Sequence, residues 1–402
     1  MKKYPEYKEV DIGWLKQIPK HWKLKRVKHS LEFFDNIRKP LSSDERGKMQ
    51  SKKYDYYGAS GIIDKVDDYL FEGEYILLGE DGANLISRSS PLAFKACGQF
   101  WVNNHAHILK PIKSNNLDYF VHLLESIDYT VSVTGSAQPK LTQEALGNQF
   151  IIEPPANEQI IISEFINKNI SQIDSLIEKK TQMIELLKEE RAALINQAVT
   201  KGINPDAEMK DSGIEWLGEV PKHWEVKKIK FVASLRSGNS ITSDEIKEEG
   251  TYPVYGGNGL RGYTSDFTHD GHFVLIGRQG ALCGNVNYAE GKFWASEHAV
   301  VATIINNSNV IWLGELLRSM NLNQYSISAA QPGLAVERIQ NLSIPCPTIE
   351  EQNIIAKHLT VKSAQIDLSI GKIEKEISLI EEYRTALINE AVTGKIKVTE
   401  SV

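Results

Sequence analysis

Two long segments of the chain, 157–200 and 350–393, share one pattern of apolar and polar positions. In both, apolar residues recur at steps of three and four residues, which is the spacing of a coiled-coil seam. The first segment has neither Gly nor Pro, and the second has only Gly371. The pattern therefore predicts two helices of about 44 residues, each about 66 Å long at 1.5 Å per residue. "TIEE" at 348–351 has the form of a capping box with Thr348 as the N-cap.

The predicted seam consists almost entirely of Ile and Leu. Its members are Ile166, Ile170, Ile173, Ile177, Ile184, Leu187 and Leu194 in the first helix, and Leu359, Ile366, Ile370, Ile373, Ile377, Ile380 and Leu387 in the second. Lys180 and Arg191 interrupt the first seam, and Ser363 and Arg384 interrupt the second. Because the second helix starts from the globular segment that follows the first, it must run back to bury its seam. We therefore expect an antiparallel coiled coil.

The other segments contain short apolar runs separated by Gly, Asn, Ser and Asp. "EYILLGEDGA" at 74–83 and "HFVLIGRQGA" at 272–281 each predict a strand that runs into a tight glycine turn. "YYGASGI" at 56–62 and "VYGGNGL" at 254–260 each predict a glycine-rich loop beside an aromatic residue.

These paired phrases belong to a duplication of the whole chain. "PKHW" occurs at 19–22 and 221–224, "FWVNNHA" at 100–106 is answered by "FWASEHA" at 293–299, and "RAALINQAVT" at 191–200 by "RTALINEAVT" at 384–393. The sequence thus predicts an α+β fold with pseudo-twofold symmetry, in which two mixed α/β heads are joined by the two antiparallel helices. The predicted domains are head one at 1–153, helix one at 154–203, head two at 204–346, and helix two with a C-terminal tail at 347–402.

Charge and cysteine content narrow the class of protein. The net charge is −6, and the two helical segments carry −2 and −3 of it, so the rest of the chain is nearly neutral. A basic run surrounds Trp22, and such runs are usually solvated surface. The three cysteines are far apart and form no Cys-x-x-Cys pair, which argues against a zinc or disulfide framework. With no signal peptide and no apolar run long enough to cross a bilayer, we expect a cytoplasmic protein.

Catalytic patterns are missing from the sequence. It has no phosphate-binding lysine loop, no dinucleotide fingerprint, and no Asn/Asp-Pro-Pro-aromatic motif of amino-methyltransferases. "HAH" at 105–107 corresponds to "HAV" in the second copy, so we expect no metal site there. His105 and His298 are expected to make structural hydrogen bonds. We therefore predict a protein with no catalytic residue, metal or cofactor of its own.

The ordered, duplicated motifs resemble the specificity subunit of type I restriction-modification systems over nearly the whole chain. The resemblance implies a sequence-specific DNA-binding protein whose heads are target recognition domains, each reading one half of a bipartite site in double-stranded DNA. It implies that the coiled coil sets the spacing and docks methyltransferase (M) subunits, two in number, which restriction-translocase (R) subunits join. S-adenosylmethionine, ATP and Mg are then expected only in those partners. The alternative is a two-headed coiled-coil scaffold that binds a protein or glycan ligand.

The glycine turns and loops supply the candidate DNA contacts. They are Tyr57, Ser60, Glu80, Asp81, Gln138 and Lys140 in the first head, and Tyr255, Asn258, Arg261, Arg278, Gln279 and Gln331 in the second. Arginine is suited to guanine O6 and N7, and a carboxylate can accept from the cytosine amine. We therefore expect Arg278 with Gln279, and Glu80 with Asp81, to differ because the two half-sites differ.

Overall fold

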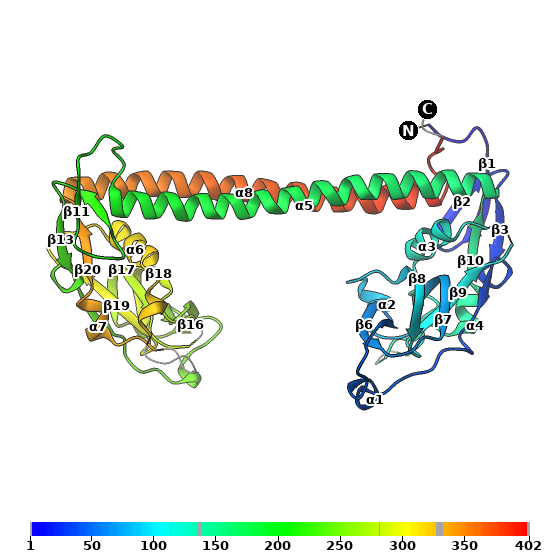
Figure 1. Cartoon of the computed structure of the whole chain (residues 1–402), viewed down its shortest axis with the longest axis horizontal. Coiled ribbons are helices and arrows are strands. Elements are labelled where there is room, and N and C mark those ends of the chain that lie inside the picture. Colours follow the sequence, from blue (N-terminus) through cyan, green and yellow to red (C-terminus); the bar gives the residue numbers. More distant parts are fainter. Residues whose placement is uncertain (1, 114, 136–137, 281, 327–332, 400–402) are drawn as a thin grey trace. The chain divides into compact units, whose positions relative to one another are not determined.

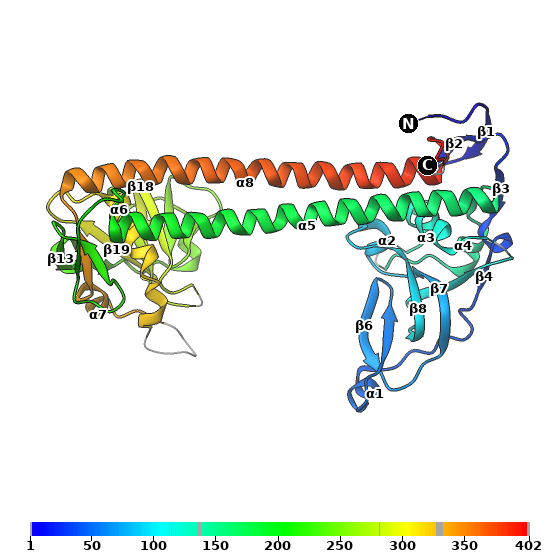
Figure 2. The ribbon, with the colours of Figure 1, turned by 45° about the horizontal axis from the view of Figure 1, so that its top comes forward.

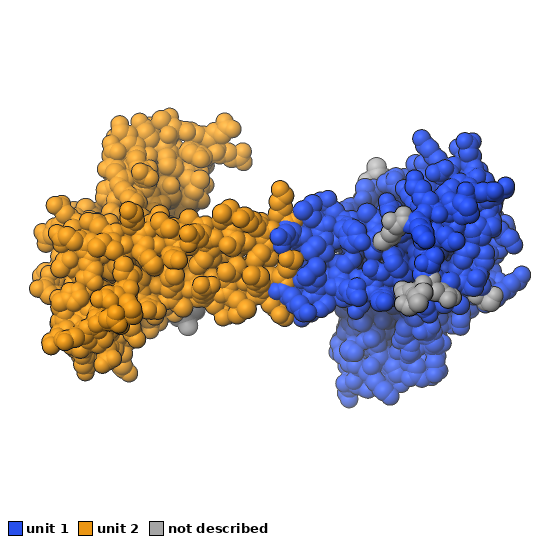
Figure 3. Space-filling view, turned by 90° about the horizontal axis from the view of Figure 1, so that it is seen from above, with its two compact units in different colours: residues 1–179, 376–402 blue, residues 180–375 orange. Residues whose placement is uncertain are grey.

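The computed structural model describes residues 2–113, 115–135, 138–280, 282–326 and 333–399. The chain forms two compact units, one of residues 1–179 with 376–402 (unit 1) and one of residues 180–375 (unit 2), which are distinguished by colour in Figure 3. Each unit has one head and a part of both long helices, α5 (Ala156–Lys201) and α8 (Ile349–Val392). No helix among the described residues is long and apolar enough to cross a membrane.

The head of unit 1 is built on a six-stranded sheet with the order β4-β9-β7-β8-β5-β6 (Figure 1). Its strands are β4 (Leu31–Phe33), β5 (Tyr54–Gly58), β6 (Gly61–Val66), β7 (Phe71–Gly79), β8 (Ala93–Val102) and β9 (Ala106–Pro111). Strands β5 and β8 are parallel, and the other neighbours are antiparallel. Two small ladders join β1 (Tyr7–Ile12) to β2 (Leu15–Pro19) and β3 (Lys23–Arg26) to β10 (Phe150–Glu153). The short helices are η1 (Val27–His29), α1 (Ser43–Gly47), α2 (Asn84–Ser87), α3 (Leu117–Ser126) and α4 (Gln143–Asn148).

The head of unit 2 repeats this topology in the order β14-β19-β17-β18-β15-β16. The strands are β14 (Ala233–Ser237), β15 (Tyr252–Gly256), β16 (Gly259–Thr264), β17 (His269–Gly277), β18 (Val286–Ala295) and β19 (Ala299–Ile304). The small ladders pair β11 (Met209–Asp211) with β12 (Glu219–Pro221) and β13 (Glu225–Lys228) with β20 (Ser343–Cys346). The short helices are η2 (Ile229–Phe231), η3 (Ser243–Glu245), α6 (Val310–Ser319), η4 (Leu322–Tyr325) and α7 (Val336–Gln340). The identical strand order confirms the predicted duplicated α+β fold.

Burial on both faces of the sheet explains the continuous apolar run in β7. Ile76 and Leu78 belong to the core that contains α3, whereas Leu77 packs with Phe100 on the opposite face. Alternate side chains of a strand point to opposite faces, so the part of a central strand that is covered on both sides is apolar at every position. In unit 2, β17 is buried in the same way.

All members of the predicted seam are buried or half-buried in the two units. In unit 1, Ile166 of α5 lies in the same core as Leu387 of α8. The Tyr119 hydroxyl is 3.2 Å from the Ile152 carbonyl oxygen, near the start of α5, and 3.1 Å from the Val392 carbonyl oxygen, at the end of α8. The helices are therefore antiparallel, as Figure 2 shows.

Two of the charged residues that interrupt the seam form ion pairs between the helices. In unit 1, Arg384 of α8 lies 3.5 Å from Asp174 of α5. In unit 2, Arg191 of α5 pairs with Asp367 of α8, so the same contact occurs at the equivalent position.

Two local predictions need correction. The Thr348 hydroxyl does accept from the Glu351 N–H (3.3 Å), but the Glu351 side chain bonds to His223 and Trp224, so the capping box is only half formed. The turn after β7 is also longer than predicted, because the short helix α2 lies between β7 and β8.

Candidate nucleic-acid interface

The turn after β7 is held in unit 1 by backbone hydrogen bonds to two distant segments. The N–H of Glu80 donates to the His105 carbonyl (2.9 Å), and the Glu80 carbonyl accepts from the N–H of Leu141 (2.8 Å). The Asp81 carboxylate is 2.9 Å from His105 Nδ1. This arrangement fixes the turn against the loops that precede β9 and α4.

The turn after β17 has the same frame in unit 2. The N–H of Arg278 donates to the His298 carbonyl (2.9 Å), and its carbonyl accepts from the N–H of Leu334 (2.9 Å). Gln279 Oε1 lies 3.1 Å from His298 Nδ1. The structure thus makes Glu80 equivalent to Arg278 and Asp81 equivalent to Gln279. It also confirms the structural role predicted for the two histidines.

Three of the predicted residues of unit 2 line one shallow hollow of about 270 Å³. They are Asn258, Arg261 and Gln279, and His298 and Leu282 complete the lining with Gly257. Asn285 Nδ2 donates to Asn258 Oδ1 (3.0 Å) and so orients that amide. The hollow therefore presents a guanidinium and two amides, which are groups that read base edges, beside the His298 imidazole.

A glycine is required beneath Arg261. A Cβ atom built on Gly256 would lie 2.4 Å from Arg261 Cδ, so any larger residue would displace the arginine side chain. Gly256 thus leaves room for the Arg261 side chain.

The other predicted residues of unit 2 lie outside this lining. Arg278 is half-buried, and its side chain has no hydrogen bond or ion pair among the described residues. Tyr255 is half-buried, with its ring edge-on to Phe293 at 5.6 Å between centroids. Gln331 falls outside the residues that the structure describes.

The structure does not support the base-reading role predicted for Glu80. Its side chain is only 7% exposed and forms ion pairs with Arg38 and with Lys140 Nζ, the latter at 3.1 Å. Both carboxylate oxygens are therefore engaged inside the protein. This burial could not be predicted from the local sequence, because Arg38 is distant from Glu80 along the chain.

Asp35, Glu80 and His107 lie close enough together to suggest a metal site. His107 Nδ1 is 2.6 Å from Asp35 Oδ2, and its Nε2 is 2.8 Å from the Leu141 carbonyl oxygen. Both ring nitrogens face acceptors, so neither is open to a metal. Since Arg38 also pairs with Glu80, ion pairs and hydrogen bonds satisfy this cluster, and we assign it a structural role.

The remaining candidates of unit 1 divide into core and surface. Tyr57 is 9% exposed and belongs to the aromatic cluster on one sheet face, with Phe94 and Phe100 as neighbours, so its predicted contact role is not supported. The exposed candidates are Ser60, Gln138 and Lys140, and Asp81 is half-buried.

Apolar residues that were not predicted from the sequence are exposed on the strand that follows each glycine-rich loop, β6 in unit 1 and β16 in unit 2. Ile62 and Ile63 of β6 are 55% and 56% exposed, and Leu260 of β16 is 53% exposed. Apolar side chains at a DNA interface contact the thymine methyl group. The signal was visible as apolar residues directly after a loop glycine, where a turn is ordinarily polar.

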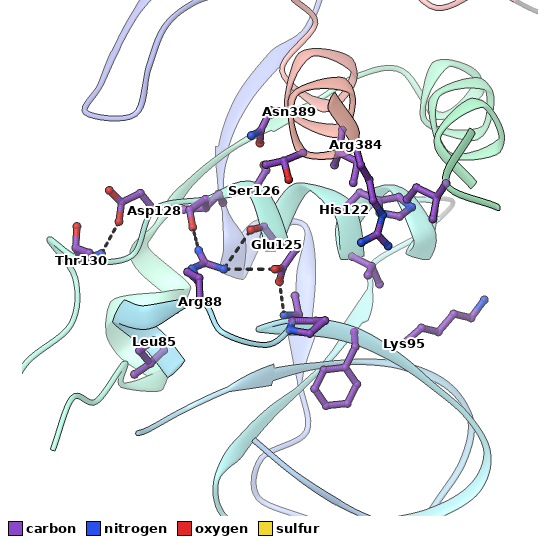
Figure 4. A pocket seen from close by; sticks show the side chains of 18 of the residues that line it. Leu85, Arg88, Lys95, His122, Glu125, Ser126, Asp128, Thr130, Arg384 and Asn389 are labelled. Atoms are coloured by element: carbon purple, nitrogen blue, oxygen red, sulfur yellow. Dashed lines mark hydrogen bonds and ion pairs between the residues drawn. The ribbon is translucent and has the colours of Figure 1, made fainter. Parts of the chain in front are cut away.

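A larger cavity of about 620 Å³ lies in unit 1 between α2, β8, α3 and the two long helices (Figure 4). Arg88 donates to the Glu125 carbonyl (3.2 Å), and the Glu125 carboxylate accepts from the N–H of Leu92 and of Ala93, both at 2.8 Å. Burial raises the pKa of Glu125 and lowers that of His122. The charged groups that line the cavity are thus largely satisfied by the protein.

Unit 2 fills the equivalent space with an aromatic ring. Tyr288 occupies the position of Lys95 in the matching strand, and its hydroxyl donates to Glu315 (2.9 Å). A Cβ atom built on Gly314 of α6 would lie only 2.1 Å from the Tyr288 hydroxyl oxygen, so this position has room only for glycine. The equivalent residue of α3 in unit 1 is Val121. The matching strand thus carries Tyr in one unit and Lys in the other.

Residues 19–186 and 221–379 both match the type I restriction modification DNA specificity domain. The chain therefore belongs to this family, which confirms the resemblance found in the sequence. The two matched segments correspond to the two copies of the duplication.

Several relatives support this assignment. The specificity subunit of the EcoprrI type I restriction enzyme of Escherichia coli is 49% identical over 129 residues, which is 31% of this chain and 32% of that protein. A putative specificity subunit of Haemophilus influenzae is 33% identical over 33% of each chain. The chain thus spans about a third of these two relatives. The MjaVIII specificity subunit of Methanocaldococcus jannaschii is 24% identical over 95% of this chain and 94% of its own.

Solved structures share the fold. A chain from a structural study of complex assembly and conformational transition in a type I R-M system has a TM-score of 0.63 and 16% identity, covering 94% of this chain and 99% of its own. The HsdS subunit from Thermoanaerobacter tengcongensis has a TM-score of 0.54 and 15% identity, covering 96% and 100%.

Proposed function

We propose that the chain is the DNA-reading subunit of a type I restriction-modification complex, in which each head reads one half of a bipartite site in double-stranded DNA. The observation that carries the proposal is the equivalence of the two turns. The backbone hydrogen bonds at Glu80 and at Arg278 match, whereas the next residue, which faces a histidine in both heads, is Asp81 in one and Gln279 in the other. A constant frame with different side chains is what reading of two different half-sequences requires.

The second head supplies the better-defined reading surface. Arg261 and Gln279 line its hollow with Asn258, and Leu260 is exposed on the same hairpin. In the first head, the corresponding contacts come from Ser60, Asp81, Gln138 and Lys140, with Ile62 and Ile63 as apolar contacts. Reading by Glu80 and Tyr57 is left out of the proposal.

We infer that methyltransferase subunits bind the long helices. Leu176, Leu379 and Tyr383 in unit 1 are 44–53% exposed on the helices, and Met183, Leu186 and Leu368 in unit 2 are 53–63% exposed. Apolar residues exposed along a helix favour a protein partner. The nearly neutral heads would attract phosphates only weakly, so partner subunits would supply much of the backbone binding.

Catalysis is assigned to the partners in this proposal. Methyltransferase subunits would bring S-adenosylmethionine, and restriction-translocase subunits would bring ATP and Mg. The chain would contribute sequence selection and spacing, with the helices joining the heads at a fixed separation.

Co-expression with the methyltransferase subunit in a host that lacks other adenine methylation tests the proposal. Single-molecule sequencing of the host DNA is expected to show one methylated motif, made of two unlike half-sequences separated by an unspecified spacer. No methylated motif, despite a stable complex of the two proteins, would favour the alternative of a scaffold for a protein or glycan ligand.

A further inference from the structure

The first turn of α5 holds the chain segment that leads into the head of unit 1. Glu158 accepts from Trp22 Nε1 (3.0 Å) and from the Tyr4 hydroxyl (3.0 Å), and its other oxygen is 2.6 Å from His21 Nε2. Trp22 is fully buried, and β3 begins at the next residue. Burial and the nearby Glu158 carboxylate raise the pKa of Tyr4, so its hydroxyl remains a donor.

The next residue of the same turn holds the head at a second point. Gln159 Oε1 accepts from the N–H of Asn116 (2.7 Å), which is the N-cap of α3. Gln159 Nε2 donates to the Pro154 carbonyl (2.9 Å), and the side chain is fully buried. Helix α3 packs on the central strands of the sheet, so this bond connects the sheet layer directly to the long helix.

Unit 2 repeats both attachments. Glu351 of α8 accepts from Trp224 Nε1 (2.9 Å) and lies 2.9 Å from His223 Nε2. Gln352 Oε1 accepts from the N–H of Asn309 (2.9 Å), the N-cap of α6, and its Nε2 donates to the Pro347 carbonyl (3.1 Å). The duplicated "PKHW" phrase is therefore explained by its partner, a Glu-Gln pair that starts each long helix.

The same tryptophans also contact the end of the other long helix. A Cβ on Gly394, just after α8, would lie 3.0 Å from the Trp22 ring, and a Cβ on Gly202, just after α5, would lie 3.2 Å from the Trp224 ring. Both glycines have positive φ, 70° and 79°. Each attachment thus joins the start of one long helix, the end of the other and the strand that follows the tryptophan.

We propose that the Glu-Gln pairs, Glu158–Gln159 and Glu351–Gln352, are positioning residues that fix each head on the helix pair and thereby determine which spacing between half-sites is accepted. This inference rests on the proposed DNA-reading function. Reading of base edges requires side chains to be held within about 0.5 Å of their productive positions. A head that rotates on its helices would still read its half-sequence but would tolerate a shifted one.

The test uses the full chain in complex with its methyltransferase subunits. Three DNA duplexes carry the cognate half-sites, one with the native spacer and two with a spacer one base pair longer or shorter. Methylation rates are compared for the wild type, Gln159→Ala and the milder Glu158→Gln. The matched control is Ser163→Ala, because Ser163 is buried one turn further along α5 and bonds only within its own helix, to the Ile160 carbonyl (2.9 Å).

The proposal predicts that preference for the native spacer over the altered ones falls about tenfold in Gln159→Ala, the size expected for loss of the buried hydrogen bond to the Asn116 N–H. Glu158→Gln should show a smaller fall, and Ser163→Ala none. An equal loss of rate on all three duplexes, or an unchanged preference in folded Gln159→Ala and Glu158→Gln, would overturn it. Failure of the wild type to methylate any split site would instead refute the proposed function.

Discussion

At the residue scale, Arg261 is the side chain best placed for base recognition in the second head. It lies over Gly256 and lines the hollow with Asn258 and Gln279. Arg261→Ala is expected to lose about 1–3 kcal/mol of discrimination at one base pair of the second half-site, the value of a bidentate arginine–guanine contact. The measurement is the methylated motif, recovered by sequencing, with the first half-site as internal reference.

Two further variants accompany Arg261→Ala, one as a control and one as a test of the contact predicted for Arg278. Arg236→Ala removes an exposed arginine of β14 outside the hollow and should leave both half-sites unchanged. Arg278→Ala tests the original sequence prediction and should also relax only the second half-site. Equal loss at both half-sites for Arg261→Ala would contradict a reading role.

Glu80 is expected to act on stability instead of recognition. Glu80→Gln leaves Arg38 and Lys140 without their buried carboxylate and should lower the free energy of unfolding by about 3 kcal/mol. Urea unfolding provides the measurement, and Glu72→Gln, which alters an exposed residue of β7, the strand that leads into the Glu80 turn, is the control. A stable Glu80→Gln variant with an altered base preference would restore the reading role.

The sequence predicted only part of the candidate site, for a physical reason. Loop identity and the equivalence of the two turns follow from local motifs, and Asn258, Arg261 and Gln279 were found in this way. Whether a loop side chain is exposed depends on residues far away in the sequence. Arg38 buries Glu80, and Phe94 and Phe100 bury Tyr57, so these two roles could not be excluded without the fold.

At the scale of elements, the long helices were predictable because their pattern is periodic over many turns. The apolar spacing recurs at every seam position, so a single interruption such as Lys180 leaves the helical periodicity recognisable. Helix α2 was missed because it has four residues and no side-chain N-cap. The capping box at Thr348 was predicted to be complete but is only half formed, because the Glu351 carboxylate bonds to His223 and Trp224 instead of to the N-cap backbone.

The seam also predicts that half of the chain will pair with itself. In a fragment of residues 1–203, the C-terminal part of α5 from a second copy takes the place of α8, with Leu194 at the position of Leu387. Arg191 then replaces Arg384 opposite Asp174, so the interhelical ion pair is kept. The fragment should be a dimer by light scattering, weaker than the native pairing because Lys180 replaces Ile373.

The full-length chain at the same concentration is the reference for this experiment. A folded fragment that stays monomeric at tens of micromolar by light scattering would contradict the seam packing. With methyltransferase subunits, the dimer should modify a palindromic split site, because a twofold dimer presents two identical heads.

At the scale of the whole molecule, the chain alone is expected to be inactive. Incubated with DNA and S-adenosylmethionine, the pure protein should transfer no methyl groups, because we assign that chemistry to the partner subunits. Tritium transfer to DNA is the measurement, and the same assay with added methyltransferase subunit is the positive control. Robust transfer by the chain alone would refute the division of labour.

The central claim is that the heads read half-sequences and the helices set their spacing, and lengthening both helices tests it most directly. Four residues inserted after Lys180 and four after Ile373 lie between the ion-paired positions of each helix and add slightly more than one helical turn, which keeps the seams roughly aligned. The helices grow by about 6 Å at 1.5 Å per residue.

DNA rises about 3.4 Å per base pair along each strand. The methylated motif of the insertion variant is therefore expected to keep both half-sequences and to gain one to two base pairs of spacer, with some loss of activity because the duplex also turns. The motif is read by sequencing DNA from cells that express the wild type or the variant. An unchanged spacer with activity intact would contradict the account.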